Sequence, residues 1–503
     1  SEMCIRDSYR TDFIRPLTVF LSMAFFCNFM CVKEGHVIGD LLLFFVKKMK
    51  RDENMSNFHD LTTGSVTKQL IRFAIPLFFA NLLQSLYNIA DMLVVGRIVG
   101  STGVAAISNA SSLVFIVNAI CMGITMGGTV LIAQYRGAKD ELRQKKTIGT
   151  IYAMTAVVAI LITCAGIFFY KQILTWMNVP KEAYQDACDY MLVIFIGTIF
   201  VFGYNATCSI LRGFGDSRSP LYFVMIAAGI NVLLDYLLVG VFSFGTVGAA
   251  YATIVSQAIS FGIAILYLRR QNFIFEFQLS SFRLEKAILS KLVQVSLPTA
   301  IQMTVVNISY LLIAVMINKY GVVIAAAAGI GLKINTFAGM PCWAIGQAVT
   351  TMVGQNMGAK LLKRTKKIVQ IGFFASILVS LIAILFIQVF AEPLIRLFDP
   401  ENQAVLKAGV VYLRICCCWN SLFYATMYNF DSFAVGVGFA NLGMINALLD
   451  ALVIRLPLCW LLGTLLEFGV RGIYWAQALS PIIPACIGML YFFSRKWQQR
   501  KLI

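Results

Sequence analysis

The chain has 503 residues, of which 59% are hydrophobic and 13% charged, whereas a soluble globular protein carries about 25% charged residues. This composition excludes a soluble globular protein and indicates an integral membrane protein. The formal net charge of +17 does not indicate nucleic-acid binding, because the Lys and Arg residues fall in short segments between apolar runs, where they orient a membrane protein.

The chain opens with a predicted N-terminal extension over residues 1–60. It begins at Ser1, and its first letters, SEMCIRDS, resemble a translated sequencing-adapter tail. The apolar run Leu17–Val32 within the extension fits a signal-like segment or an extra span, but its length of about 16 residues is short for a membrane span. We therefore expect Met49 or Met55 to be the natural start, and residues 1–48 to be dispensable for membrane insertion.

Twelve apolar runs follow, each close to the length of about 20 residues that crosses a bilayer as a helix. The first six lie near residues 70–96, 103–133, 147–170, 187–211, 220–241 and 246–268. The second six lie near 290–317, 323–355, 367–391, 404–430, 440–464 and 470–494. We predict two six-helix bundles over 61–268 and 290–494, a cytoplasmic linker over 269–289 and a cytoplasmic tail over 495–503.

Basic residues concentrate in alternate connections between these runs. They are Arg136, Lys139, Arg143, Lys145 and Lys146 after the second run, Lys360, Lys363, Arg364, Lys366 and Lys367 after the eighth, Arg269, Arg270 and Arg283 in the linker, and Arg495, Lys496, Arg500 and Lys501 at the C-terminus. The positive-inside rule predicts that these segments and both termini are cytoplasmic.

The two sets of runs repeat each other in sequence. QYRGAK at Gln134–Lys139 recurs as QNMGAK at Gln355–Lys360, an offset of 221 residues, and Pro76 recurs as Pro298 at an offset of 222. Further pairs recur at 223 and 224, namely Gly213 with Gly436, Gly215 with Gly438, Gly248 with Gly472, Ser256 with Ser480 and Tyr267 with Tyr491. Because each unit has an even number of spans, the repeat predicts two parallel bundles around a central cavity suited to alternating access.

Carboxylates interrupt two of the apolar runs in the first bundle. Asp91 follows Gln84 and Asn88 at a spacing that puts all three on one helix face, and Asp235 follows Asn231 at i, i+4. An ionised carboxylate in hydrocarbon costs at least about 2.5–3.5 kcal/mol, so an intramembrane acid is by default a functional-site hypothesis.

The neighbouring spans supply further oxygen ligands at similar depth. Thr253 adds a hydroxyl from the sixth span, and Asn205, which is expected to lie deeper, adds an amide from the fourth. Carboxylate, amide and hydroxyl oxygens form a group that hard cations select, and two close carboxylates without a metal would instead hold a proton. The competing structural interpretation is that these side chains join helices by hydrogen bonds, which is common for Asn, Gln and Thr.

Four stretches carry a specific family resemblance: LYNIADMLVVGRIVG, LRGFGDSRSP, INVLLDYLLVG and GAAYATIVSQ. From about Leu61 to the C-terminus, the chain resembles the multidrug and toxic compound extrusion (MATE) family of bacterial cation-coupled exporters. The resemblance implies an outward-opening pair of bundles that exports amphipathic organic cations in exchange for Na⁺ or H⁺. In the family's cation site, the matching residues are Asp91, Asn205, Asn231, Asp235 and Thr253.

The resemblance also implies a multi-pass protein of the bacterial inner membrane, with membrane lipids as neighbours and no cofactor; we expect a monomer. The chain departs from one branch of the family, which has a glutamate in the seventh span and an aspartate deep in the tenth. Here the seventh span has no acid, and Asp431 lies at the end of the tenth. Asp450 and Arg455, at i, i+5 in the eleventh span, are expected to point to different faces, either to pair with other spans or to take part in transport.

Methionine and aromatic residues are candidates for an adaptable substrate cavity, although such residues are more often ordinary packing. They are Met122, Met126, Met303, Met340, Trp343, Tyr424 and Met427, and Gln84 and Asn88 join them as polar candidates. Two other functions compete with drug export. A flippase for lipid-linked intermediates would need a cavity rich in Arg and Lys to hold phosphates, and Arg455 is the chief intramembrane cation. An enzyme would need a nucleophile with a base, or a metal with nitrogen or sulfur ligands, and the sequence suggests neither.

Overall fold

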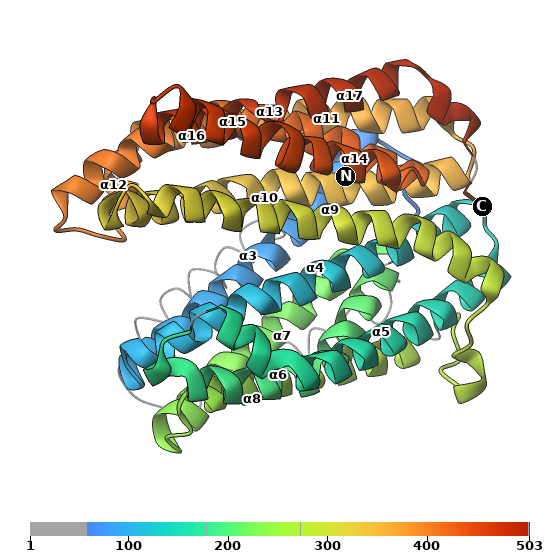
Figure 1. The fold of residues 1–503 in the computed structure, drawn as a ribbon. Helices are drawn as coiled ribbons and strands as arrows, with labels where there is room; N and C mark the ends of the chain where they lie inside the picture. The colour runs from blue at the N-terminus through green and yellow to red at the C-terminus, as the bar shows by residue number, and fades with distance from the viewer. Residues whose placement is uncertain (1–57, 178, 272, 501) are drawn as a thin grey trace, which may run out of the picture. The chain divides into compact units, whose positions relative to one another are not determined.

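The computed structural model describes residues 58–177, 179–271, 273–500 and 502–503. The expected start at Met49 or Met55 lies outside the described residues. Ser56–Ile503 forms one unit by its internal contacts. Its described residues form helices and turns (Figure 1), and twelve of the helices are long and apolar enough to cross a membrane. Each coincides with one of the twelve predicted runs, so the helical membrane fold predicted from the sequence is confirmed.

The first half of the unit runs from blue to green in Figure 1. Its helices are α3 (Val66–Ile98), α4 (Ser101–Gly137), α5 (Glu141–Trp176), α6 (Lys181–Gly213), α7 (Arg218–Asp235) with the π-helical η2 (Tyr236–Val241), and α8 (Gly245–Arg270). The side chain of Asp140 caps α5 by accepting a hydrogen bond from Arg143 N (3.0 Å), which satisfies a backbone donor that the first turn leaves free.

The second half follows a linker that contains η3 (Leu279–Ser281). Its elements are α9 (Lys286–Asn318), α10 (Val322–Gly358), α11 (Leu362–Val389), α12 (Ala391–Arg396), α13 (Gln403–Val437), α14 (Ala440–Leu448), η4 (Leu449–Arg455), α15 (Leu456–Trp460), η5 (Leu461–Leu465), α16 (Gly469–Leu479), α17 (Ile482–Phe493) and η6 (Lys496–Gln499). The eleventh span is the continuous run from α14 to η5, and α16 with α17 forms the twelfth.

Unusual backbone angles recur at equivalent places in the two halves. Lys139 and Lys360, which end the repeated QYRGAK and QNMGAK motifs, both have φ 58°. Gly215 (87°) and Gly438 (91°) form a second such pair. A positive φ is uncommon for a residue with a side chain, so its recurrence at both lysines indicates that the repeat extends to the backbone of these turns.

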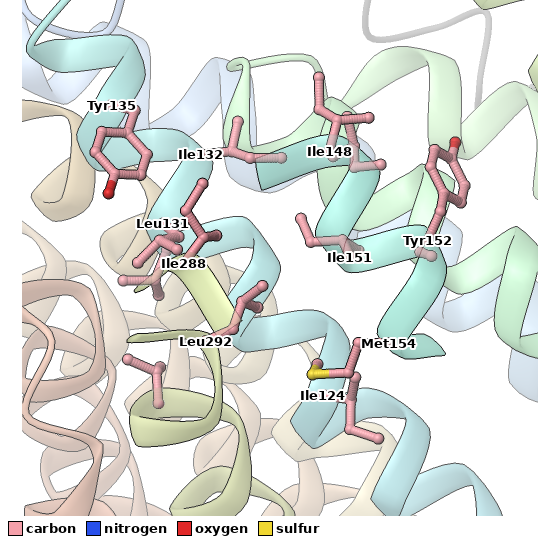
Figure 2. Close-up of a cluster of buried hydrophobic side chains, with 14 of the residues drawn as sticks. Ile124, Leu131, Ile132, Tyr135, Ile148, Ile151, Tyr152, Met154, Ile288 and Leu292 are labelled. Carbon is pink, nitrogen blue, oxygen red and sulfur yellow. The ribbon is translucent and has the colours of Figure 1, made fainter. Parts of the chain in front are cut away.

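Two helices carry their first turns into the opposite half. In α3, Leu70 and Leu77 belong to a buried cluster with α10 residues such as Val349. In α9, Ile288 and Leu292 belong to a cluster built mainly from α4 and α5, which Figure 2 shows. The end of the unit where α3 and α9 begin also carries the basic loops after α4 and α10, since Arg364 contacts Gly64 and Lys146 pairs with Glu285. We call it the basic end, and there each half is packed against the other.

Candidate functional site

Three helices of the first half bring the predicted polar residues together. Asp91 is on α3, Asn231 and Asp235 are on the last turns of α7, and Thr253 is on α8. The Thr253 hydroxyl donates to Asp91 Oδ2 (3.3 Å). Asp91 is 8% exposed and Asp235 is fully buried, so both carboxyl groups are removed from solvent and lipid.

The oxygen atoms of this group are poorly satisfied. The side chains of Asn231 and Asp235 both lie within interaction range of the Asp91 carboxyl. Asp91 Oδ1, both carboxyl oxygens of Asp235 and both amide atoms of Asn231 nevertheless lack a hydrogen-bond partner among the described residues. Buried polar atoms are nearly always hydrogen-bonded. An all-oxygen group with free lone pairs fits a proton or a hard cation.

Three side chains that the sequence analysis did not single out surround this group. The Tyr87 hydroxyl accepts a hydrogen bond from Gln257 Nε2 (3.4 Å), and Tyr190 on α6 is close enough to Asp91 and Asp235 for their charges to interact. Gln257 lies one helical turn after Thr253, so its spacing could have predicted it. Tyr190 lies between a polar segment and the apolar residues that follow it, and carries no comparable signal.

The other polar candidates are less buried than the two carboxyl groups. Asn205 is half-buried and donates to Val201 O (2.9 Å) on its own helix. Gln84 and Asn88 are exposed, unlike Asp91 on the same predicted face, and Gln84 interacts with the Tyr87 hydroxyl. The assignment of Asn205 to the ion site, and of Gln84 and Asn88 to a substrate cavity, therefore stays a prediction.

The methionine and aromatic candidates divide by burial. Met340 and Met427 are buried, whereas Met122, Met126, Met303, Trp343 and Tyr424 are partly exposed. Tyr424 stacks on Tyr428 with ring centroids 6.1 Å apart, and Trp343 interacts with the Tyr428 hydroxyl, so α10 and α13 share an aromatic contact. Whether these side chains line a cavity stays a prediction.

The second half holds a separate buried polar network. Asp431 accepts hydrogen bonds from Asn446 Nδ2 (2.6 Å) and Gln302 Nε2 (3.4 Å). Arg455 forms an ion pair with Asp450, donates from Nε to Ser480 Oγ (3.1 Å), and lies over the Tyr310 ring, 4.9 Å from its centroid.

The expectation that Asp450 and Arg455 point to different faces is wrong. Five residues span about 500°, and so differ by about 140° in direction, on an ideal α-helix. The segment η4 is π-helical from Leu449 to Arg455. Its i to i+5 hydrogen-bond pattern stacks residues five apart. The two side chains therefore meet on one face and pair with each other.

The turn between α6 and α7 carries a buried acid outside the membrane-spanning helices. Asp216 Oδ1 accepts from Arg218 N (2.9 Å) and Ser219 N (3.0 Å) at the start of α7. Burial raises the pKa of Asp216 to about 6, against the opposing effect of these hydrogen bonds. The nearby His59 has its pKa lowered by burial and by the charges of Arg72 and Arg218.

Comparison with known proteins identifies the fold. The sequence model of the MatE family matches residues 76–237 and 298–461, one segment in each half. The chain belongs to the MatE family. It is similar to two proteins of Bacillus subtilis (strain 168). The first, "Probable multidrug resistance protein YpnP", is 30% identical over 454 residues, which cover 88% of this chain and 98% of the relative. The second, "Probable multidrug resistance protein YoeA", is 28% identical over 448 residues, which cover 87% of this chain and 96% of the relative.

The MatE fold is also found among solved structures. One of them, described as the outward-facing conformation of a multidrug resistance MATE family transporter, has a TM-score of 0.82 and 21% identity, and the likeness covers 88% of this chain and 98% of the other. MatE proteins are membrane transporters rather than enzymes, and this MatE chain is accordingly a multi-pass membrane transporter.

Proposed function

We propose that this transporter exports amphipathic organic cations in exchange for Na⁺ or H⁺, and that Asp91 and Asp235 bind the coupling ion. The observation that carries the proposal is the pair of buried, adjacent carboxyl groups whose oxygen atoms lack partners among the described residues. Two close carboxylates cannot both stay ionised without a counter-ion, so they share a proton or a cation. The names of the two Bacillus relatives support drugs as the cargo.

The membrane orientation is part of the same proposal. The chain lies in a bacterial cytoplasmic membrane, as a monomer among lipids, with the basic end and both termini in the cytoplasm. Helices α3 and α7 then run outward from the cytoplasm, and the carboxyl pair lies in the outer part of the membrane. The flippase alternative is less favoured, because Arg455, its chief cation for holding a phosphate, is already paired with Asp450.

Exchange requires that the ion and the cargo favour different bundle arrangements, because a ligand that binds both arrangements equally shifts neither. Asp91→Asn keeps the size of the side chain and removes its charge. We expect it to abolish transport at near-normal membrane level, and we expect Asp235→Asn to do the same with no further loss in the double variant. Asp189→Asn is the matched control, since Asp189 is a surface acid on α6 that contacts Gln185.

The measurement is efflux of a cationic dye from proteoliposomes, with Na⁺ and pH gradients imposed separately. One of the two gradients should drive efflux by the parent protein and by Asp189→Asn, and that gradient identifies the coupling ion. Gradient-driven efflux by Asp91→Asn at the parent rate would contradict the role given to this carboxyl. Poor expression combined with normal specific activity would favour a structural role instead.

A further inference from the structure

At the basic end, each half of the transporter caps a helix of the other. Gln134 on α4 donates from Nε2 to Gly436 O on α13 (3.0 Å), and Gln355 on α10 donates from Nε2 to Gly213 O on α6 (3.0 Å). The two glutamines are repeat equivalents, and so are the two glycines. These hydrogen bonds are therefore a reciprocal pair that crosses between the halves.

The acceptors are carbonyl groups in the last turns of their helices. Helix α6 ends at Gly213, and α13 ends one residue after Gly436. The last four carbonyls of a helix have no partner within it. Among the described residues, no other hydrogen bond reaches either carbonyl, so each glutamine supplies its donor from the opposite half, and separating the halves would return both carbonyls to water.

Backbone contact accompanies the reciprocal hydrogen bonds. A Cβ atom added at Gly137 would overlap the carbonyl group of Gln355, and one added at Gly358 would overlap that of Gln134. Both glycines lie three residues after the motif glutamines, at the ends of α4 and α10. The absence of a side chain at these two positions is what allows the helix ends to meet.

The segment before α3 adds to the contact on one side. Gln355 Oε1 accepts from Leu61 N (3.0 Å), and Asn356 Nδ2 donates to Leu61 O (3.1 Å). Arg364 donates to the carbonyls of Gly64 (2.6 Å) and Thr63 (2.7 Å). The Gln355 side chain thus holds α6 of the first half and the segment leading into α3 at the same time.

We propose that Gln134, Gly137, Gln355 and Gly358 form a latch that keeps the two halves closed at the basic end. The proposal rests on the exporter function above, since alternating access requires this end to open. The hydrogen bonds of the latch break when this end opens. Removing one glutamine donor should shift the ratio of closed to open molecules about fivefold toward the open form, and removing both about 25-fold, as expected for hydrogen bonds of ordinary net strength.

The test uses Gln134→Leu, Gln355→Leu and the double variant of the full chain in lipid nanodiscs. Opening is measured by amide hydrogen exchange in the peptides that contain residues 134–140 and 355–361. Asn429→Leu is the matched control, because Asn429 is equally buried and donates to Val369 O (3.4 Å) within a single half and outside both peptides. We expect faster exchange in the latch variants, with the largest increase in the double variant, and parent-like exchange in the control.

Parent-like exchange in the double variant would overturn the latch, and so would an equal increase in Asn429→Leu. If the double variant does not accumulate in folded form, Gly358→Ala provides the same readout, because its added Cβ pushes against the Gln134 carbonyl; unchanged exchange there would also overturn the proposal. The readout needs neither cargo nor gradient. A protein that shows the latch effect but no dye efflux would refute the exporter function and leave the latch intact.

Discussion

Replacing Arg455 by Met should destabilise the second half by about 3–5 kcal/mol, because it leaves a buried carboxylate without its partner. Arg455 and Asp450 are both fully buried, and they are joined to each other and, through Arg455 Nε, to Ser480. Methionine fills much of the same volume without a charge. The loss therefore comes chiefly from the uncompensated charge of Asp450 rather than from an empty space.

A double-mutant cycle separates this effect from simple loss of packing. Asp450→Asn combined with Arg455→Met removes both charges, so the double variant should be more stable than Arg455→Met alone. The matched control is Lys146→Met. Lys146 pairs with Glu285 at 2.6 Å in an exposed setting, with side chains 44% and 42% exposed, and loss of an exposed pair costs about 0–1 kcal/mol.

The assay is denaturant titration of purified protein in mixed micelles, followed by tryptophan fluorescence. The reasoning fails if Arg455→Met is as stable as the parent, or if Lys146→Met is destabilised to the same extent. It also fails if the double variant is less stable than Arg455→Met, because the two charges would then not compensate each other.

Two other predictions concern the basic end. Burial raises the pKa of Asp216 to about 6 from its ordinary value of 3.8, so the folded state binds a proton more readily than the unfolded chain. Stability should therefore fall by about 2 kcal/mol as the pH rises from 4 to 7. Asp216→Asn should flatten this part of the profile in thermal unfolding scans, and an unchanged slope would exclude this origin. Cysteines introduced at Lys139 and Lys360 should both resist impermeant thiol reagents in whole cells, so that labelling of each variant does not exceed labelling of the parent chain. Labelling at only one of the two positions would contradict two parallel bundles.

The helices could be predicted because the signal for each lies in its own residues. A run of about 20 apolar residues has few alternatives to a membrane helix, and all twelve runs coincide with described helices. The repeat could also be predicted from the sequence, and the structure agrees with it, because the motif lysines Lys139 and Lys360 adopt the same rare backbone angle. The packing of α3 and α9 against the opposite halves could not be predicted from the sequence, because it depends on contacts between segments far apart in the chain.

The candidate site was only partly predictable for the same reason. The spacing of Asn231 and Asp235 on a regular helix correctly puts both on one side of α7, close to Asp91. The spacing of Asp450 and Arg455 misled, because the backbone there is π-helical and local sequence gives no clear sign of it. Tyr190 joins the site through tertiary packing alone.

Equivalent positions in the two halves explain why the proposed ion site lies in one half. At the repeat offsets of 222 and 224, Asp91 corresponds to Ile313, Asp235 to Cys459 and Asn231 to Arg455. Ile313 and Cys459 are buried among apolar side chains, and Arg455 has its counter-charge in Asp450. The buried acid Asp450 of the second half thus has a cation beside it, whereas among the described residues no salt bridge is formed by Asp91 or Asp235. If Asp91 and Asp235 bind the coupling ion as we propose, a change in its occupancy is expected to act on α3, whose first turns pack against the second half.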